Sequence, residues 1–357
     1  MSLPEDVDGL VRIKAFGIGG GGGNAVSRMA REAVPGIEYI AVNTDAQALA
    51  RSDAPYRLRI GDQITRGLGA GGNPEIGRQA AEESRDDIYE AVKNSDMVFV
   101  ASGMGGGTGT GAAPVIAQVA RETGALTIGI VTRPFAFEGN HRARQAEEGI
   151  AALHGCVDSL IIVPNERLLA VAGTDASWHD AFRMADDVLG QGVHAISELV
   201  TVPGEINLDF ADVRTVMSLS GQALMAIGNG RGSTRATDAA KAAIQNPLLE
   251  IDITGATGVL YNITAGSDLS LAEIHAASEI IASAVDPNAN IIFGVVSNRA
   301  SDGEVQLTLI ATGFETAQET FEDDEVVDQI LRDALGDGDL DLPPFLRRKT
   351  KSRRIAR

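Results

Sequence analysis

Short apolar runs recur along the first half of the chain, bounded by Gly, Asn or Asp and separated by stretches with helical periodicity. Strands of a parallel sheet are buried on both faces and therefore read as continuous apolar segments. Their alternation with helices predicts a doubly wound, mostly parallel α/β sheet. The predicted strands are VRIKAFGI (11–18), IEYIAVN (37–43), MVFVASG (97–103), LTIGIVT (126–132) and SLIIVPN (159–165).

One long helix and a second region are predicted after these strands. Apolar residues three or four positions apart run through residues 176–200, and Pro203-Gly204 ends the pattern. About 25 residues at ~1.5 Å each give a rod of roughly 37 Å, long enough to connect two domains. Residues 205–314 mix helical stretches with three strand-like runs, at 258–266, 291–298 and 305–314, and predict a smaller α+β domain.

The last part of the chain has the composition of a tail. Residues 315–341 hold eleven carboxylates and one Arg, which favours an extended, solvated linker. Residues 341–357 reverse the charge, with seven Lys or Arg, and place two prolines beside Phe345 and Leu346. A short apolar motif on a flexible leash is typical of a docking peptide, and a frayed terminus is the alternative.

The composition narrows the function classes. The 357 residues are 44% apolar but only 4% aromatic, so the core must be built mainly from Ala, Val, Ile and Leu. A formal net charge of −19 argues against a nucleic-acid partner, because phosphate contacts need a basic face. Cys156 is the single cysteine, which excludes an intramolecular disulfide and a multi-thiolate metal site. Since no signal peptide or long apolar segment is recognisable, we expect a cytoplasmic protein.

Two glycine-rich loops carry the candidate chemistry. GIGGGGGNAV (17–26) follows a predicted strand and opens a helix, and Asp45 closes the next strand about 26 residues later. Alone, this pattern supports a nucleotide-dependent dehydrogenase, and a tight turn is the simpler alternative.

The second loop, GGGTGTG (105–111), also lies between a strand and a helix, so its backbone N–H groups face the same edge of the sheet as the first loop. Two such cradles suit a chain of phosphates, and Thr108 and Thr110 add hydroxyl donors. No P-loop lysine is present, so Mg²⁺ is expected to balance a triphosphate, bound mainly through the phosphates.

Several ordered motifs together resemble the FtsZ family. GGGTGTG is similar to the signature of the tubulin and FtsZ superfamily. The motifs that narrow the resemblance to FtsZ are GIGGGGGNAV, AVNTDAQAL, PFAFEGNHR, IVPNERLL, NLDFADVRTVM and the terminal DLPPFLRR. The resemblance covers about residues 10–316 and the terminal peptide, and it implies a Rossmann-like GTPase domain, a long central helix, a smaller α+β C-terminal domain and a disordered tail.

The resemblance implies a site for GTP and GDP. Glu138 and Arg142 would hold the ribose, with Asn165 nearby, and Phe182 and Asp186 would stack on and hydrogen-bond the guanine. A carboxylate suits guanine because it accepts from both N1–H and the 2-amino group, although a solvated helix-face carboxylate is the simpler alternative for Asp186. The other residues expected at the nucleotide, all in loops at this edge of the sheet, are Gly20, Gly21, Gly22, Gly23, Asn24, Asn43, Asp45, Ala70, Gly71, Gly103, Gly105, Gly106, Gly107, Thr108, Gly109 and Thr132.

NLDFADV places Asp209 and Asp212 three residues apart at the predicted start of a helix, where capping is the simpler alternative. The resemblance implies that these catalytic carboxylates, supported by Asn207, complete the site of the next subunit in a filament. The implied function is GTP-dependent head-to-tail assembly into the division ring, with GTP hydrolysed at subunit interfaces. The two rival hypotheses are an NAD-dependent dehydrogenase and a non-hydrolysing structural filament protein.

The resemblance also divides the chain into segments. We expect a flexible N-terminus (1–10), a GTP-binding domain (11–175), a central connecting helix (176–202), a C-terminal GTPase-activating domain (203–316), an acidic linker (317–340) and a docking peptide with a basic end (341–357). Leu342, Pro343, Phe345 and Leu346 would anchor membrane-tethering and regulatory division proteins at mid-cell, on the inner face of the membrane. Contact of the chain itself with the membrane would be indirect or weak.

Overall fold

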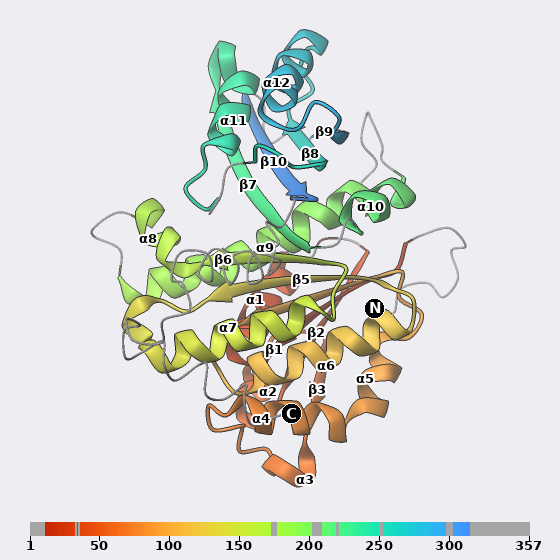
Figure 1. Ribbon diagram of the computed structural model, residues 1–357, viewed down its shortest axis with the longest axis vertical. Coiled ribbons are helices and arrows are strands. Elements are labelled where there is room, and N and C mark those ends of the chain that lie inside the picture. Colours follow the sequence, from red (N-terminus) through yellow and green to blue (C-terminus); the bar gives the residue numbers. More distant parts are fainter. Residues whose placement is uncertain are drawn as a thin grey trace, which may run out of the picture. The chain divides into compact units, whose positions relative to one another are not determined.

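Ten strands form one continuous sheet in the described part of the chain, in the order β3-β2-β1-β4-β5-β6-β7-β10-β8-β9 (Figure 1). This computed structural model describes residues 11–314, apart from 33, 35, 173–176, 202–208, 219–220, 250–252 and 298–302. The described residues belong to one compact unit that ends at Phe314. Asn207, the N-terminus (1–10), the acidic linker (317–340) and the docking peptide with Leu342, Pro343, Phe345 and Leu346 lie outside the described residues.

The N-terminal strands are parallel, and the five predicted strands are confirmed. They are β1 (Ile13–Ile18), β2 (Ile37–Asn43), β4 (Met97–Gly103), β5 (Leu126–Arg133) and β6 (Ser159–Pro164). A further edge strand, β3 (Tyr56–Arg59), was not predicted from the sequence. Its sequence YRLR is largely exposed, so it lacks the apolar run that marks a buried strand.

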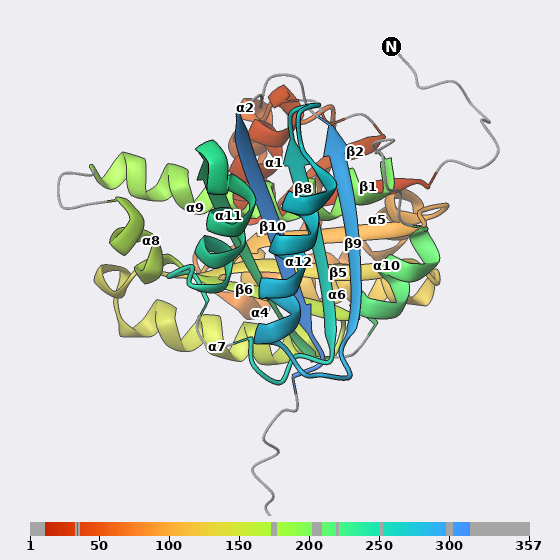
Figure 2. The same cartoon turned by 90° about the horizontal axis from the view of Figure 1, so that it is seen from above.

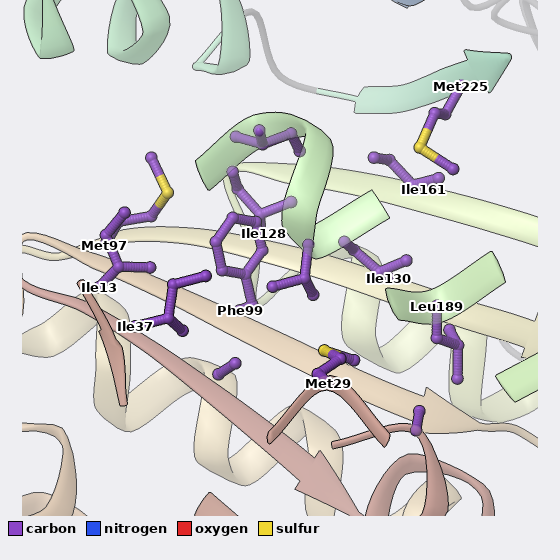
Figure 3. Packing of buried hydrophobic residues seen from close by; sticks show 14 of the residues in the cluster. Ile13, Met29, Ile37, Met97, Phe99, Ile128, Ile130, Ile161, Leu189 and Met225 are labelled. Atoms are coloured by element: carbon purple, nitrogen blue, oxygen red, sulfur yellow. The ribbon is translucent and has the colours of Figure 1, made fainter. Parts of the chain in front are cut away.

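Helices cover both faces of this parallel part. Alternate residues of β1 divide between the two sides, with Ile13 and Ala15 in one apolar cluster and Phe16 and Ile18 in the other. One side is packed by α1 (Gly19–Glu32), α8 (Asn165–Ala172), α9 (Trp178–Thr201) and α10 (Phe210–Met217). Figure 3 shows Met29 of α1 and Leu189 of α9 in this cluster with Phe99 and Ile130 of the sheet. The other side is packed by α4 (Pro74–Glu83), α5 (Arg85–Val92), α6 (Thr108–Glu122) and α7 (Asn140–His154).

Short elements complete the N-terminal part. They are α2 (Ala46–Arg51), α3 (Asp62–Thr65) and the 3₁₀ turn η1 (Ala136–Glu138).

The predicted long helix is confirmed as α9, with 24 residues and a length of about 36 Å. Its buried residues recur three or four apart, which explains why the helix was visible in the sequence. Two glycines let it approach its neighbours closely, since a Cβ on Gly190 would lie 3.3 Å from Met29 and one on Gly192 would lie 3.1 Å from Ile130. In Figure 1, α9 lies between the parallel strands and the C-terminal part.

The C-terminal part is a mixed sheet with two helices on one face. It holds β7 (Gly221–Arg231), the turn η2 (Gly232–Thr234), α11 (Arg235–Ile244), β8 (Gly258–Ala265), α12 (Leu271–Ala284), β9 (Asn290–Ser297) and β10 (Glu304–Thr312). β10 is antiparallel to β7 and β8, whereas β8 and β9 are parallel. Figure 2 shows β8, β9 and β10 running across the direction of the N-terminal strands.

The three strands predicted here are confirmed, but β7 was missed. Its sequence GQALMAIGNGR contains three Gly, one Asn and one Gln, which resemble a loop more than a strand. β7 pairs with β6 over Ser159–Ile161, so the smaller domain continues the main sheet. No helix in the described ranges is long and apolar enough to cross a membrane.

The packing of α1 against the sheet gives a first prediction. A Cβ on Gly22 would lie 2.2 Å from the backbone oxygen of Ala101, whereas a Cβ on Gly23 would meet nothing within 4 Å. We expect Gly22→Ala to lower the free energy of unfolding by about 2 to 3 kcal/mol, because α1 must move away from β4. Gly23→Ala is the matched control and should raise it by about 0.5 to 1 kcal/mol, because alanine favours the helix. Denaturant unfolding of the nucleotide-free protein measures both, and equal effects would contradict the packing argument.

Candidate functional site

A cavity of about 540 Å³ lies at the carboxyl ends of the parallel strands. β1, β4, β5 and β6 are consecutive neighbours in the sheet, so the residues that follow them lie side by side. α1 and α6 begin at this edge, and their N-termini present unpaired backbone N–H groups and positive helix dipoles. The predicted residues that line this cavity are Gly20, Gly21, Asn24, Gly103, Gly106, Gly107, Thr108, Gly109, Thr132, Glu138, Arg142, Asn165, Phe182 and Asp186.

The glycines of the two loops divide into packed and open positions. A Cβ on Gly107 would lie 2.9 Å from Ala70, and one on Gly109 would lie 2.8 Å from the backbone oxygen of Gly103. Gly20 and Gly106 line the cavity, and a Cβ there would meet no protein atom within 4 Å. The open positions leave bare backbone facing the cavity, which is the arrangement that cradles phosphate groups.

The two threonines of the second loop have different surroundings. Thr108 lines the cavity, and its hydroxyl lies 2.7 Å from the hydroxyl of Thr44. The Thr110 hydroxyl is buried and accepts a hydrogen bond of 2.8 Å from the backbone N–H of Gly105. Thr110 therefore holds the loop in shape, while Thr108 faces the cavity.

Asp186 is the buried carboxyl group of the cavity, with 9% of the residue exposed. Burial raises its pKa to about 7, although the Arg28 guanidinium 3.5 Å away partly opposes this. Asp187 adds to the rise, and its own carboxylate lies 3.4 Å from Arg28. The simple reading of Asp186 as a solvated helix-face carboxylate does not fit this burial.

Polar groups on the other wall are arranged around α7 and β6. Glu138 accepts a 2.9 Å hydrogen bond from the backbone N–H of Phe135 and pairs with Arg142 one helical turn later. Asn165 is 5% exposed, and its side-chain oxygen is buried with no hydrogen-bond partner in the described residues. An unpaired buried acceptor at a cavity wall suits a hydroxyl donor such as that of a ribose.

A second cavity of about 720 Å³ adjoins the first and shares Gly20, Asn24 and Arg28 with it. The predicted residues Gly23 and Asn43 line this cavity. Its wall also holds Arg31, which pairs with Asp53.

Five predicted residues do not line either cavity: Gly22, Asp45, Ala70, Gly71 and Gly105. Asp45 caps α2, since its Oδ1 accepts from the backbone N–H groups of Gln47 at 2.8 Å and Ala48 at 3.1 Å. Gly105 has a φ of +96°, and a Cβ there would lie 2.8 Å from the backbone oxygen of Arg142. Gly22 and Ala70 are packing positions beside the loops, and Gly71 is exposed at the surface.

Asp209 and Asp212 lie away from the cavities, at the start of α10, which follows the far end of α9. Asp209 occupies the N-cap position, but its side chain makes no capping hydrogen bond. Both residues are exposed. The capping alternative therefore does not account for Asp209.

Several lining residues were missed by the sequence analysis: Arg28, Met104, Pro134, Trp178, His179, Arg183, Ala185 and Leu189. Most of them share a helix face with a predicted residue. Arg28 lies four positions after Asn24, and Trp178 and His179 lie four and three positions before Phe182. Helical spacing from the predicted residues was the signal that could have identified them.

The buried carboxyl group gives a prediction about stability. Because the pKa of Asp186 is raised to about 7 in the folded state, folding favours the neutral form of this carboxyl group. The resulting contribution to the free energy of unfolding is fully present below the ordinary pKa of about 4 and is lost as the pH rises through 7. We expect Asp186→Asn to stabilise the nucleotide-free protein by an amount that grows from pH 4 and reaches roughly 4 kcal/mol above pH 7. Denaturant unfolding at several pH values measures this gain. Asp86→Asn, at an exposed position in the first turn of α5, is the control, and a gain for Asp186→Asn that does not vary with pH would contradict the assignment.

Comparison with known proteins agrees with this geometry. The Tubulin/FtsZ family GTPase domain matches residues 12–173, and the FtsZ family C-terminal domain matches residues 221–315. The chain is 42% identical to the empty FtsZ dimer of M. jannaschii, with a TM-score of 0.82, over 86% of this chain and 89% of that one.

Two Haloferax volcanii structures share the fold at lower identity. GDP-bound monomeric CetZ1 is 21% identical with a TM-score of 0.73, over 90% of this chain and 99% of that one. The CetZ2 protofilament with bound GTPγS is 18% identical with a TM-score of 0.73, over 91% of this chain and 99% of that one. The two domain matches and the 42% identity to an FtsZ show that the chain is a GTPase that belongs to the FtsZ family.

Proposed function

We propose that this FtsZ-family GTPase binds GTP in the 540 Å³ cavity and hydrolyses it between subunits of a head-to-tail filament that builds the division ring. The observation that carries the proposal is that the nucleotide-binding features and the exposed carboxylates lie in different parts of one chain. The cavity combines two open glycine loops with a buried carboxyl group, while Asp209 and Asp212 are exposed beyond the far end of α9. The FtsZ dimer of M. jannaschii and the CetZ2 protofilament of Haloferax volcanii support self-association.

The backbone at the two helix N-termini would hold the phosphates. Gly20 and Gly106 expose their main chain to the cavity, and the dipoles of α1 and α6 favour negative charge there. Mg²⁺, when bound with GTP, would neutralise part of the triphosphate charge, in keeping with a cavity lining that contains no lysine.

Side chains on the other walls would select and orient the nucleoside. Asp186, when ionised, accepts from both N1–H and the 2-amino group of guanine, a pair of donors that adenine lacks. Phe182 lies one turn before Asp186 on the same face of α9 and offers an aromatic surface for the base. Asn165 and the Glu138–Arg142 pair lie on the other wall, where they would bind the ribose hydroxyls.

Hydrolysis would need the carboxylates of a second subunit. Asp186 of the cavity lies 15 residues before the end of α9 at Thr201, about 22 Å along the helix, and Asp209 and Asp212 follow that end, too far away to reach the nucleotide of the same subunit. In a head-to-tail filament the start of α10 would face the next subunit's cavity. There an exposed carboxylate can orient and polarise the attacking water.

The two rival functions leave features of the molecule unused. A dehydrogenase needs the Asp45 carboxylate to bind the ribose. In this structure that carboxylate caps α2 instead, where it accepts hydrogen bonds from the backbone N–H groups of Gln47 and Ala48. A filament protein without hydrolysis gives no role to Asp209, whose carboxylate lies exposed without capping α10.

A site shared between subunits makes hydrolysis depend on assembly. We expect GTP turnover per subunit to be low in dilute protein and to rise steeply above a critical concentration, together with light scattering. With GDP or NADH in place of GTP, scattering should stay at the baseline. Turnover per subunit that is the same at every protein concentration would argue that each subunit is complete by itself.

Mutations can separate the two halves of the shared site. We expect Asp212→Ala to retain GTP binding and lose at least about 100-fold in turnover, because only the transition state uses this carboxylate. Asp86→Ala is the matched control, an exposed carboxylate in the first turn of α5, and should leave turnover unchanged.

The trans arrangement has its own test. Gly20→Val fills the open cavity without striking protein atoms within 4 Å of the new Cβ, so it should block GTP binding while the chain folds. When the two variants are mixed, some interfaces combine the intact cavity of an Asp212→Ala subunit with the intact Asp212 of a Gly20→Val subunit. Recovery of turnover in the mixture supports hydrolysis in trans, and recovery is absent if Asp212 acts within its own subunit.

The remaining parts of the proposal concern segments outside the described residues. We propose that the acidic linker (317–340) tethers a docking peptide, whose Leu342, Pro343, Phe345 and Leu346 bind membrane-tethering division proteins.

The division of the chain into domains is a further part of the proposal. It comprises a GTP-binding domain (11–175), a connecting helix (176–202) and a GTPase-activating domain (203–316). It agrees with the order of the elements on either side of α9.

A further inference from the structure

Trp178 has a large, solvent-exposed aromatic side chain at the wall of the cavity. It is the first residue of α9, it lines the 540 Å³ cavity, and it is 74% exposed. It is also the chain's one tryptophan. An exposed aromatic residue at a cavity wall indicates a surface that a ligand covers.

The neighbouring aromatic rings fix the place of Trp178 relative to the base site. Its ring lies 6.4 Å from that of Phe182, at an interplanar angle of 76°. Phe182 also contacts Phe135, with ring centroids 5.3 Å apart, and Phe135 is buried. The residue already proposed to contact the base therefore touches both a buried ring and the exposed indole.

The spacing along α9 puts the two rings on one face of the helix. Trp178 and Phe182 are four residues apart, and Asp186 follows after four more. All three line the same cavity. A purine held at Phe182 and Asp186 would thus lie in the same cavity as the indole, one helical turn from it.

We propose that Trp178 is a nucleotide-positioning residue whose indole packs against the bound guanine nucleotide and slows its release. This inference rests on the proposed GTP site. The indole loses exposed apolar surface when the nucleotide enters, and it gains an edge-to-face aromatic contact with the base. Both gains disappear when the nucleotide leaves, so Trp178 acts on the rate of dissociation and not on the chemical step.

Intrinsic fluorescence tests the contact directly, because all tryptophan emission comes from Trp178. GDP is added to the full chain at a concentration below that of assembly, and its binding is measured in parallel by equilibrium dialysis. We expect the emission to change with GDP occupancy and acrylamide quenching to fall at least about twofold. GDP binding with unchanged emission and quenching would overturn the inference, as would a change that occurs only on assembly, since a neighbouring subunit would then be what covers the indole.

Substitutions test the effect on release. We expect Trp178→Ala to speed dissociation of a fluorescently labelled GDP about 5- to 10-fold in a displacement experiment, while Trp178→Phe restores most of the slow rate. Tyr89→Ala is the control, since Tyr89 is 50% exposed on α5 and lines neither cavity. Unfolding midpoints identify any loss of folding.

The possible failures are distinguishable. If the unmutated chain binds no GDP, the proposed function itself is wrong. If it binds GDP and Trp178→Ala releases GDP at the unmutated rate, the GTP site stands and only the role of Trp178 is overturned.

Discussion

Close approach between backbones is the constraint on which the rest of this structure depends. α1 and α6 both begin at the edge of the sheet, and they meet there only because glycines remove the side chains between them. A Cβ on Gly22 would strike the oxygen of Ala101, one on Gly109 would strike that of Gly103, and one on Gly19 would lie 2.8 Å from the backbone nitrogen of Gly109. These contacts bring two helix N-termini to one cavity, where the positive ends of two dipoles would act on the same anion.

The second constraint is the packing of α9 along that assembly. Gly190 and Gly192 allow the helix to lie against Met29 of α1 and Ile130 of β5, with its apolar face buried from Ala181 to Leu199. The same contact buries Asp186 beside Arg28 and raises the pKa of its carboxyl group to about 7. One helix therefore supplies the wall of the cavity at its start and leads to the exposed carboxylates of α10 beyond its end. The proposed nucleotide site and the surface proposed to act on the next subunit are thus joined by a single helix.

Much of the fold could be predicted because its signals are local. Five parallel strands are continuous apolar runs, and α9 carries buried residues at helical spacing over 24 positions. β3 and β7 could not be recognised in this way. β3 is a largely exposed edge strand of four residues, and β7 is rich in glycine and is defined by its pairing with β6 and β10. Strand pairing depends on residues far away in the chain, and no local pattern reports it.

The sequence by itself determined the two glycine loops, the helices that follow them and the long helix, because glycine runs, apolar runs and helical spacing act over a few neighbouring residues. Most residues of the cavity wall followed from the resemblance of its motifs to the FtsZ family. Only the tertiary structure decided which glycines face the cavity, as Gly20 and Gly106 do, and which are packing positions, as Gly22 and Gly105 are. It also decided that Asp45 caps α2, that Asp186 is buried and that Trp178 lines the same cavity as Asp186. These properties arise from contacts between segments distant in sequence, such as Ala101 with Gly22 and Arg28 with Asp186, and they exist only once the chain has folded.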